Sequence, residues 1–268
     1  MPADRGVDAA LREGVIAIAR DAAAAILRVY ESDFDVERKA DASPLTEADL
    51  ASHRCIVSGL AALTPDIPVL SEESAHAIAA SERRGWRRLW VVDPLDGTRE
   101  FVKRNGEFCI NIALVEDGAP VFGLILAPVG GALWHGAPGV GAWRRDGDDE
   151  RAIAARVPAT SPLRVAASRS HLDPRTAALM QRIGDTQAVG MGSALKFCLL
   201  AEGGMDVYPR FAPTSEWDTA AGQAIVVAAG GAVLDPQGRP LRYNQRDTLL
   251  NGDFIALGDA SLPWTTWL

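Results

Sequence analysis

An uncharged run that ends in two carboxylates is the feature that most restricts how this chain can fold. The run at residues 89–92 is followed by Asp-Pro-Leu-Asp-Gly-Thr at 93–98. The proline lacks a backbone N–H and forces the residue before it into extended geometry, so we expect a buried strand that stops at the Asp-Pro pair and a turn after it. The turn would bring Asp93, the Leu95 carbonyl and Asp96 together. Hard oxygen ligands in this arrangement suit Mg²⁺ or Mn²⁺.

Gly97 and Thr98 follow the second aspartate, at the expected start of a helix. Free backbone N–H groups at a helix start can hold a phosphate. The alternative is an ordinary Asp-Pro turn whose acids cap a helix. The strand, the hexapeptide and the turn together favour a functional site over that alternative.

Two more acidic positions fit the same site. Glu72 and Glu73 end a short predicted strand, where adjacent acids are costly unless they are solvated or neutralised by cations. Taken alone this pair is more typical of a solvated loop, and Glu72 is the better ligand candidate. Asp218 opens a predicted apolar helix, where an N-cap or first-turn acid is the ordinary interpretation. That role is compatible with metal binding if the other carboxylate oxygen faces the ion.

The hydrophobic pattern predicts a layered α/β architecture, because helices and strands alternate along much of the chain. Thr46 opens the second helix, with Asp49 in the position of a capping-box acid. We expect a loop at 31–44, an exposed charged segment at 81–88 and a hairpin turn at 116–118. The predicted helices are 7–30, 46–63, 174–183, 193–202 and 217–229, and the predicted strands are 67–70, 89–92, 108–115, 121–127, 140–143, 163–167, 187–191 and 205–208, with others near Leu133, Val233 and Phe254.

A polar stretch at 144–151 is the best candidate for a boundary between two halves. We therefore predict an N-terminal α+β half at residues 1–150 that binds metal. A C-terminal α/β half occupies residues 151–268, and the family resemblance given below implies that it completes the active site and the substrate pocket.

Composition excludes several classes of protein. The 268 residues carry 27 Lys and Arg against 35 Asp and Glu, a net charge of −8, which argues against broad binding of polymeric nucleic acid. No uncharged apolar run reaches the roughly 18–20 residues that span a bilayer, and the N-terminus lacks the apolar core of a signal peptide. Three scattered cysteines match neither a disulfide framework nor a metal site. We expect a cytoplasmic protein, either a monomer or a homodimer; peripheral membrane association is left open only by the family resemblance given next.

These motifs resemble the inositol monophosphatase superfamily of Mg²⁺-dependent, lithium-sensitive phosphatases. The resemblance covers nearly the whole chain: the Glu pair at 72–73, the hexapeptide at 93–98, Trp-Asp at 217–218 and, after eleven residues, Gly-Gly at 230–231. It implies an α/β (α+β) fold, a layered αβαβα sandwich of the inositol monophosphatase and fructose-1,6-bisphosphatase type.

The resemblance also implies roles for individual residues. Two or three Mg²⁺ ions would be held by Glu72, Asp93, the Leu95 carbonyl, Asp96 and Asp218. Thr98 and Asp49 are similar to the family's Thr–Asp pair, whose hydroxyl orients or relays a proton from the attacking water, and Glu72 is the third catalytic candidate. For Asp49, helix capping alone remains the alternative.

Within the superfamily, the segments around 98–108, 192–198 and 208–211 are similar to bacterial 3′(2′),5′-bisphosphate nucleotidases. This similarity implies a small nucleotide bisphosphate as substrate: adenosine 3′,5′-bisphosphate, hydrolysed to AMP and phosphate, with 3′-phosphoadenylyl sulfate as a second candidate. The substrate-binding candidates are Leu95, Asp96, Gly97, Thr98, Arg169, His171, Ser193, Lys196, Arg210 and Asp218. Taken singly, the basic and hydroxyl residues of the second half are more typical of surface charges or caps.

Two other functions stay open at this point. One is a different phosphatase of the superfamily, acting on inositol monophosphate or another sugar phosphate. The other is a non-catalytic nucleotide or metal sensor on the same scaffold, which the presence of every metal position together with Thr98 and Asp49 disfavours.

Overall fold

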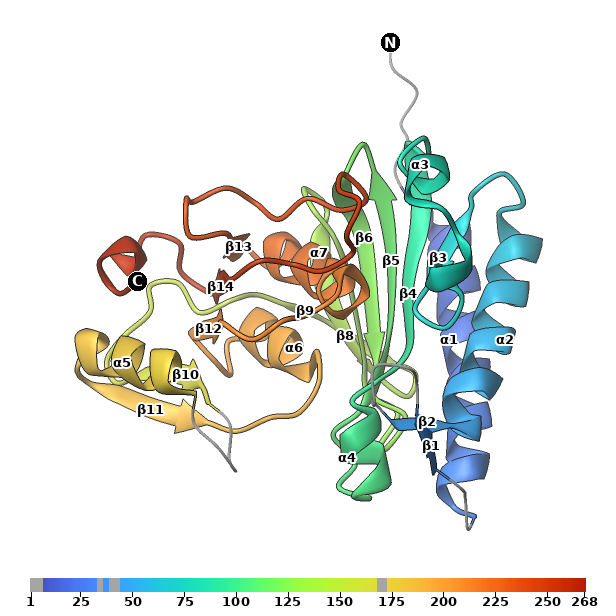
Figure 1. Ribbon diagram of the computed structural model, residues 1–268. Helices are drawn as coiled ribbons and strands as arrows, with labels where there is room; N and C mark the ends of the chain where they lie inside the picture. Colours follow the sequence, from blue (N-terminus) through green and yellow to red (C-terminus); the bar gives the residue numbers. More distant parts are fainter. Residues whose placement is uncertain (1–6, 33–35, 39–43, 168–172) are drawn as a thin grey trace.

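The computed structural model describes residues 7–32, 36–38, 44–167 and 173–268. Five layers follow one another across the molecule: a pair of helices, a seven-stranded sheet, a second pair of helices, a five-stranded sheet and a last helix (Figure 1). The predicted αβαβα sandwich is therefore confirmed. Among the described residues, no helix combines the length and the apolar character needed to cross a bilayer.

The larger sheet has the strand order β3-β4-β5-β6-β7-β8-β9. Its first pair is parallel and all the others are antiparallel neighbours in sequence. The strands are β3 (Val69–Ser71), β4 (Arg88–Asp96), β5 (Cys109–Glu116), β6 (Ala119–Leu126), β7 (Leu133–Ala137), β8 (Gly141–Asp146) and β9 (Asp149–Ile153).

Two long helices, α1 (Ala9–Tyr30) and α2 (Glu47–Leu63), cover one face of this sheet. They pack closely because Gly59 lies against Ile18, where an added Cβ would come within 2.7 Å of the isoleucine side chain. The apolar cluster between helices and sheet includes Trp90 of β4, which is fully buried. Through these contacts α2 is fixed against β4, the strand that carries the predicted metal ligands.

The opposite face is covered by α6 (Leu195–Ala201) and α7 (Ala220–Ala228), both from the second half of the chain. Gly123 of β6 allows the close approach of α7, because a Cβ at this position would lie 2.3 Å from the Ala221 carbonyl oxygen. Apolar residues of both sheets and both helices form one continuous cluster. The two halves of the chain therefore share a core.

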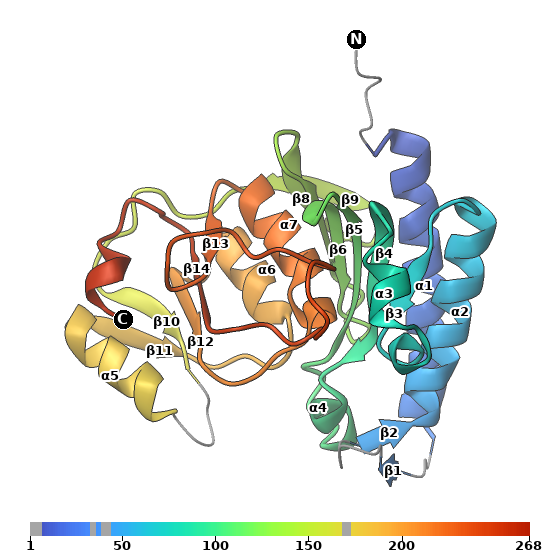
Figure 2. The same cartoon turned by 45° about the horizontal axis from the view of Figure 1, so that its top comes forward.

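The smaller sheet has the order β11-β10-β12-β14-β13, and α5 (Pro174–Ile183) covers its outer face (Figure 2). β10 is parallel to both of its neighbours, and β14 is antiparallel to both of its own. The strands are β10 (Leu163–Ala166), β11 (Thr186–Val189), β12 (Val207–Arg210), β13 (Ala232–Leu234) and β14 (Phe254–Leu257). The remaining elements are the strands β1 (Val36–Arg38) and β2 (Pro44–Thr46), the short helices α3 (Ala80–Arg83) and α4 (Thr98–Val102), and the 3₁₀ turns η1 (Ala75–Ala77), η2 (Glu216–Asp218) and η3 (Trp264–Thr266).

Most elements lie where the hydrophobic pattern predicts them, and three predictions need correction. The segment 31–44 is not all loop, because β1 pairs with β2. The charged segment at 81–88 is not all exposed: Arg83 is buried and donates to Asn244 Oδ1 at 3.1 Å. The predicted strand does not stop at Asp93-Pro94 but continues as β4 to Asp96.

The polar stretch at 144–151 forms the β8–β9 hairpin at the edge of the larger sheet. That sheet ends at Ile153, and the smaller sheet begins at Leu163. The division of the chain into halves at residue 150 stays a prediction.

Candidate metal and phosphate site

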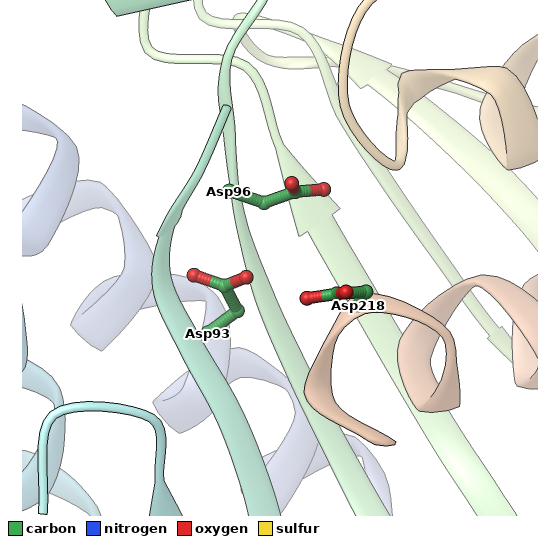
Figure 3. Close-up of side chains that lie close together, drawn as sticks. All are labelled: Asp93, Asp96 and Asp218. Atoms are coloured by element: carbon green, nitrogen blue, oxygen red, sulfur yellow. The ribbon is translucent and has the colours of Figure 1, made fainter. Parts of the chain in front are cut away.

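Three aspartates meet where the edge of the larger sheet faces the second half of the chain. Asp93 and Asp96 lie on β4, and Asp218 ends the turn η2 that precedes α7. One carboxylate oxygen from each lies within 4.8 Å of those of the other two. In Figure 3 the three carboxylates point toward one another. The structure thus brings together three of the acids that the sequence predicts as ligands.

A bulge in β4 places the first two aspartates on the same side. The pairing of β4 with β5 is regular up to Asp93 and shifts register before Asp96. Pro94, which has no N–H to donate, lies within this irregular part, where no regular hydrogen bond between the strands is needed. The Leu95 N–H donates to Asp93 Oδ1 at 3.0 Å. From the helix layer, the buried Ser52 hydroxyl donates to the Pro94 carbonyl at 2.7 Å. These bonds hold the backbone between the two acids in one conformation.

Asp96 is fixed by groups from both halves. Its Oδ2 accepts the Ala194 backbone N–H at 2.5 Å and the Asn111 side-chain amide at 3.4 Å. Glycine suits position 97 for two reasons: its φ of +93° is a conformation that other residues rarely adopt, and an added Cβ would lie 3.2 Å from the Ser193 Cβ. Both of these bonds to Asp96 use the same carboxylate oxygen.

Asp218 is held in a similar way. Its Oδ2 accepts the Ser215 backbone N–H at 2.8 Å and closes the turn η2. It does not cap the apolar helix, as the simplest interpretation of the sequence suggests, because Thr219 stands at the N-cap of α7. The bond to Ser215 uses one carboxylate oxygen of Asp218, so it remains compatible with metal binding by the other oxygen.

The three carboxylates do not ionise independently in this site. Burial raises the pKa of Asp93 well above its usual range, and the nearby Glu72, Asp96 and Asp218 raise it further. Burial also raises the pKa of Asp96, against a lowering by the Lys196 ammonium. Burial, followed by the charge of Asp96, raises the pKa of Asp218 to about 7. The site concentrates negative charge that its surroundings neutralise only in part.

The donor set fits a divalent, oxygen-preferring cation. The cluster is all carboxylate, without histidine or thiolate, which is the ligand set of Mg²⁺ and similar ions. A cation of charge +2 would offset the repulsion between these acids, which adds to the effect of burial on the pKa values of Asp93 and Asp218. Asp93, Asp96 and Asp218 could therefore hold such an ion.

Glu72 stands beside the three aspartates. It follows β3, its backbone N–H donates to the Val92 carbonyl at 3.1 Å, and its side chain is hydrogen-bonded to Asp93. It is not in the cluster of three acids whose oxygens approach within 4.8 Å. Its role as ligand or catalyst stays a prediction, supported by its bond to a cluster member.

Thr98 and Asp49 also meet, as predicted. The Thr98 hydroxyl lies 3.3 Å from Asp49 Oδ1 and 3.4 Å from the Leu95 carbonyl oxygen. Asp49 is buried, and its Oδ2 accepts the Thr46 N–H at 2.8 Å and the Thr46 hydroxyl at 2.6 Å. The capping and active-site interpretations of Asp49 are therefore compatible, because each uses a different oxygen.

A cleft of about 650 Å³ opens from this cluster between the two halves. Its lining includes several predicted substrate-binding residues: Asp96, Gly97, Ser193, Lys196, Arg210 and Asp218. Leu95 and Thr98 do not line it: Leu95 is buried, and Thr98 begins α4 between the lining residues Gly97 and Arg99. Arg169 and His171 fall outside the described residues.

Sequence reasoning missed other residues of the site. Ser52 and Asn111 support the acids from a helix and a neighbouring strand, and the Ala194 amide does so from the second half. Phe211 lines the cleft. Nothing in the sequence distinguishes Ser52 from other serines in helices. Phe211, in contrast, belongs to the segment 208–211, whose similarity to bisphosphate nucleotidases is visible in the sequence.

Comparison with known proteins agrees with this geometry. A family described as the inositol monophosphatase family matches residues 8–260. A 3′(2′),5′-bisphosphate nucleotidase CysQ from Salmonella typhimurium is 50% identical over 244 residues, which cover 90% of this chain and 97% of that protein. CysQ from Escherichia coli K12 is 48% identical over 242 residues, which cover 90% and 96%.

Solved structures give the same result. A crystal structure of CysQ from Bacteroides thetaiotaomicron has a TM-score of 0.79 at 43% identity, covering 91% of this chain and 96% of that one. An inositol monophosphatase from Zymomonas mobilis has a TM-score of 0.75 at 28% identity, covering 97% and 98%. The fold is thus shared by proteins named for nucleotide and for inositol substrates.

Proposed function

The chain belongs to the inositol monophosphatase family, and from that premise we propose that it is a 3′(2′),5′-bisphosphate nucleotidase that hydrolyses adenosine 3′,5′-bisphosphate to AMP and phosphate. The observation that carries the proposal is the cluster of Asp93, Asp96 and Asp218, two of which line a cleft large enough for a nucleotide. Relatives about 50% identical over nine-tenths of the chain bear the name of this activity.

Enzymes of this family are metal-dependent and generally use Mg²⁺. We propose that two or three ions are held by Glu72, Asp93, the Leu95 carbonyl, Asp96 and Asp218. When bound, the metal supplies positive charge that neutralises the phosphate, lowers the pKa of water and stabilises the leaving alkoxide. An acidic chain can in this way act on a doubly phosphorylated substrate.

The chain's own residues position the attacking water. The Thr98 hydroxyl has Asp49 Oδ1 as its nearest acceptor, at 3.3 Å. With its proton directed to that carboxylate, the hydroxyl oxygen keeps lone pairs that accept a hydrogen bond from water. Asp49 cannot turn away, because Thr46 holds its other oxygen through two bonds. Water is thus oriented for direct attack on phosphorus.

Basic and hydroxyl groups of the second half are suited to the rest of the substrate. The Lys196 ammonium donates to the Ser193 carbonyl at 2.7 Å and lies 5.4 Å from the centre of the Tyr208 ring. Arg210 lines the same cleft. We propose that these cations bind the second phosphate. Roles for Arg169 and His171, turnover of 3′-phosphoadenylyl sulfate, the oligomeric state and a cytoplasmic location stay predictions.

Phosphate release from three substrates tests the function: adenosine 3′,5′-bisphosphate, inositol 1-phosphate and fructose 1,6-bisphosphate, each with Mg²⁺, with EDTA, and with added Li⁺. We expect preference for the nucleotide and dependence on Mg²⁺. Asp93→Asn should lose most activity while its circular dichroism spectrum is unchanged. Normal turnover by this variant would remove Asp93 from the metal site.

Inositol monophosphatase activity is the second candidate, favoured by the shared fold of the Zymomonas mobilis structure. A higher kcat/KM for inositol 1-phosphate than for the nucleotide would select it. Nucleotide binding without turnover of any substrate would indicate a sensor instead.

A further inference from the structure

Aromatic surface in the cleft comes from two side chains among the described residues, Tyr208 and Phe211. The Tyr208 ring is already enclosed: it makes edge contacts with Phe197 and Phe254 at 5.1 and 5.5 Å, and the Lys196 ammonium lies over it. It is 6% exposed. Tyr208 therefore has little surface to offer a ligand.

Phe211 is different, because it is half-buried and follows the end of β12 at the wall of the cleft. The Arg175 guanidinium lies over its ring, 4.2 Å from the centroid. Phe211 lines the cleft, whereas Arg175 does not. An ion pair from Arg175 to Asp253 at 2.6 Å holds the guanidinium in place.

These contacts fix the ring in orientation while part of its surface remains open. A flat aromatic surface backed by a cation suits a flat, π-bearing ligand, and stacking of a nucleobase on such a ring is a common source of affinity. A polyol ring has no such face. Met191 and Ala167 add apolar lining to the same cleft.

We propose that Phe211 is the platform on which the nucleobase of the substrate stacks, with Arg175 as the residue that positions it. This inference rests on the proposed nucleotidase function and names the residue that would separate nucleotides from inositol phosphates within the shared fold.

The test compares substrates with and without a base. KM and kcat are measured for adenosine 3′,5′-bisphosphate and for abasic 1,2-dideoxyribose 3,5-bisphosphate with wild type, Phe211→Ala, Phe211→Leu and Phe211→Tyr. We expect Phe211→Ala and Phe211→Leu to raise KM for the nucleotide by about 5- to 150-fold, leaving the abasic substrate within about twofold. Phe211→Tyr should retain wild-type values because it keeps the ring.

Leu262→Ala is the matched control, because Leu262 packs against the same apolar cluster as Phe211 but does not line the cleft. It should leave both KM values unchanged. Arg175→Ala should raise KM for the nucleotide alone, by less than Phe211→Ala, with kcat unchanged. Equal losses on both substrates, or no loss in Phe211→Ala, would overturn the proposal.

The test of the Phe211 platform can be distinguished from the test of the proposed nucleotidase function. If wild type does not hydrolyse the nucleotide, the function fails, and the platform is still tested by calorimetric binding of AMP against ribose 5-phosphate. Weakened AMP binding in Phe211→Ala, with ribose 5-phosphate unaffected, would support the platform. Equal AMP binding by wild type and this variant would refute it.

Discussion

Asp218→Asn should make the metal-free protein more stable at high pH while it removes Mg²⁺ binding. The folded-state pKa of Asp218 is about 7, against 3.8 for the free side chain. Between these values the folded state holds a proton that the unfolded state has lost, so metal-free stability falls as pH rises through this window and is constant above it. Asparagine has no such proton and keeps an oxygen to accept the Ser215 N–H.

The size of the effect follows from the shift. Each pH unit inside the window costs about 1.36 kcal/mol, so the stability of the wild type should fall by about 2 kcal/mol from about pH 5.5 to 7, relative to Asp218→Asn. For a chain of this size that corresponds to a difference in melting temperature of roughly 4–8 °C. Above about pH 8 the two curves should run in parallel.

Urea denaturation across this pH range, with EDTA and with millimolar Mg²⁺, is the assay. Mg²⁺ should stabilise the wild type most at high pH, because it neutralises the crowded carboxylates, and should stabilise Asp218→Asn far less. Parallel pH profiles of the two metal-free proteins would show that the pKa of Asp218 is not raised in the folded state. An equal Mg²⁺ response would show that it is not a ligand.

Three further substitutions test the groups around the acids. Ser52→Ala leaves the Pro94 carbonyl without its 2.7 Å donor. We expect urea denaturation to show a loss of about 1–3 kcal/mol in the free energy of unfolding, and calorimetry to show weaker Mg²⁺ binding. An unchanged metal affinity would argue against control of the β4 bulge by this hydroxyl. Thr98→Val should lower kcat by roughly 10²–10⁴-fold with little change in KM, while Thr98→Ser stays active; similar rates for both would remove the hydroxyl from water orientation. Lys196→Ala should raise KM for adenosine 3′,5′-bisphosphate more than for 3′-AMP in phosphate-release assays, and equal effects would mean that it does not bind the second phosphate.

Local signals in the sequence were sufficient to predict the structure where one segment determines its own conformation. The helix α5 begins and ends at the predicted residues, because Asp173 caps it, a proline occupies its first turn and a glycine follows its end. The capping box of Thr46 and Asp49 is equally local. The carboxylate motif was recognisable because its acids are close in sequence as well as in space.

Features that depend on distant partners could not be predicted. β4 crosses Pro94 because β5 tolerates a bulge at that point, which no property of the β4 sequence reveals. Arg83 looked solvated within its charged segment, but its partner Asn244 is 161 residues away. The Ala194 amide that binds Asp96 is a backbone group, and the identity of its side chain carries no sign of that contact.

The hydrogen bond between Asp96 and Ala194, residues 98 positions apart, has a consequence for synthesis on the ribosome. A nascent chain that has completed only the larger sheet carries Asp93 and Asp96, yet it has neither Asp218 nor the amide that orients Asp96. Such a fragment should capture Mg²⁺ poorly at the concentrations that load the finished protein. Phosphatase activity would then begin only once the whole polypeptide has folded, so that prematurely terminated products remain inert toward the phosphate esters around them.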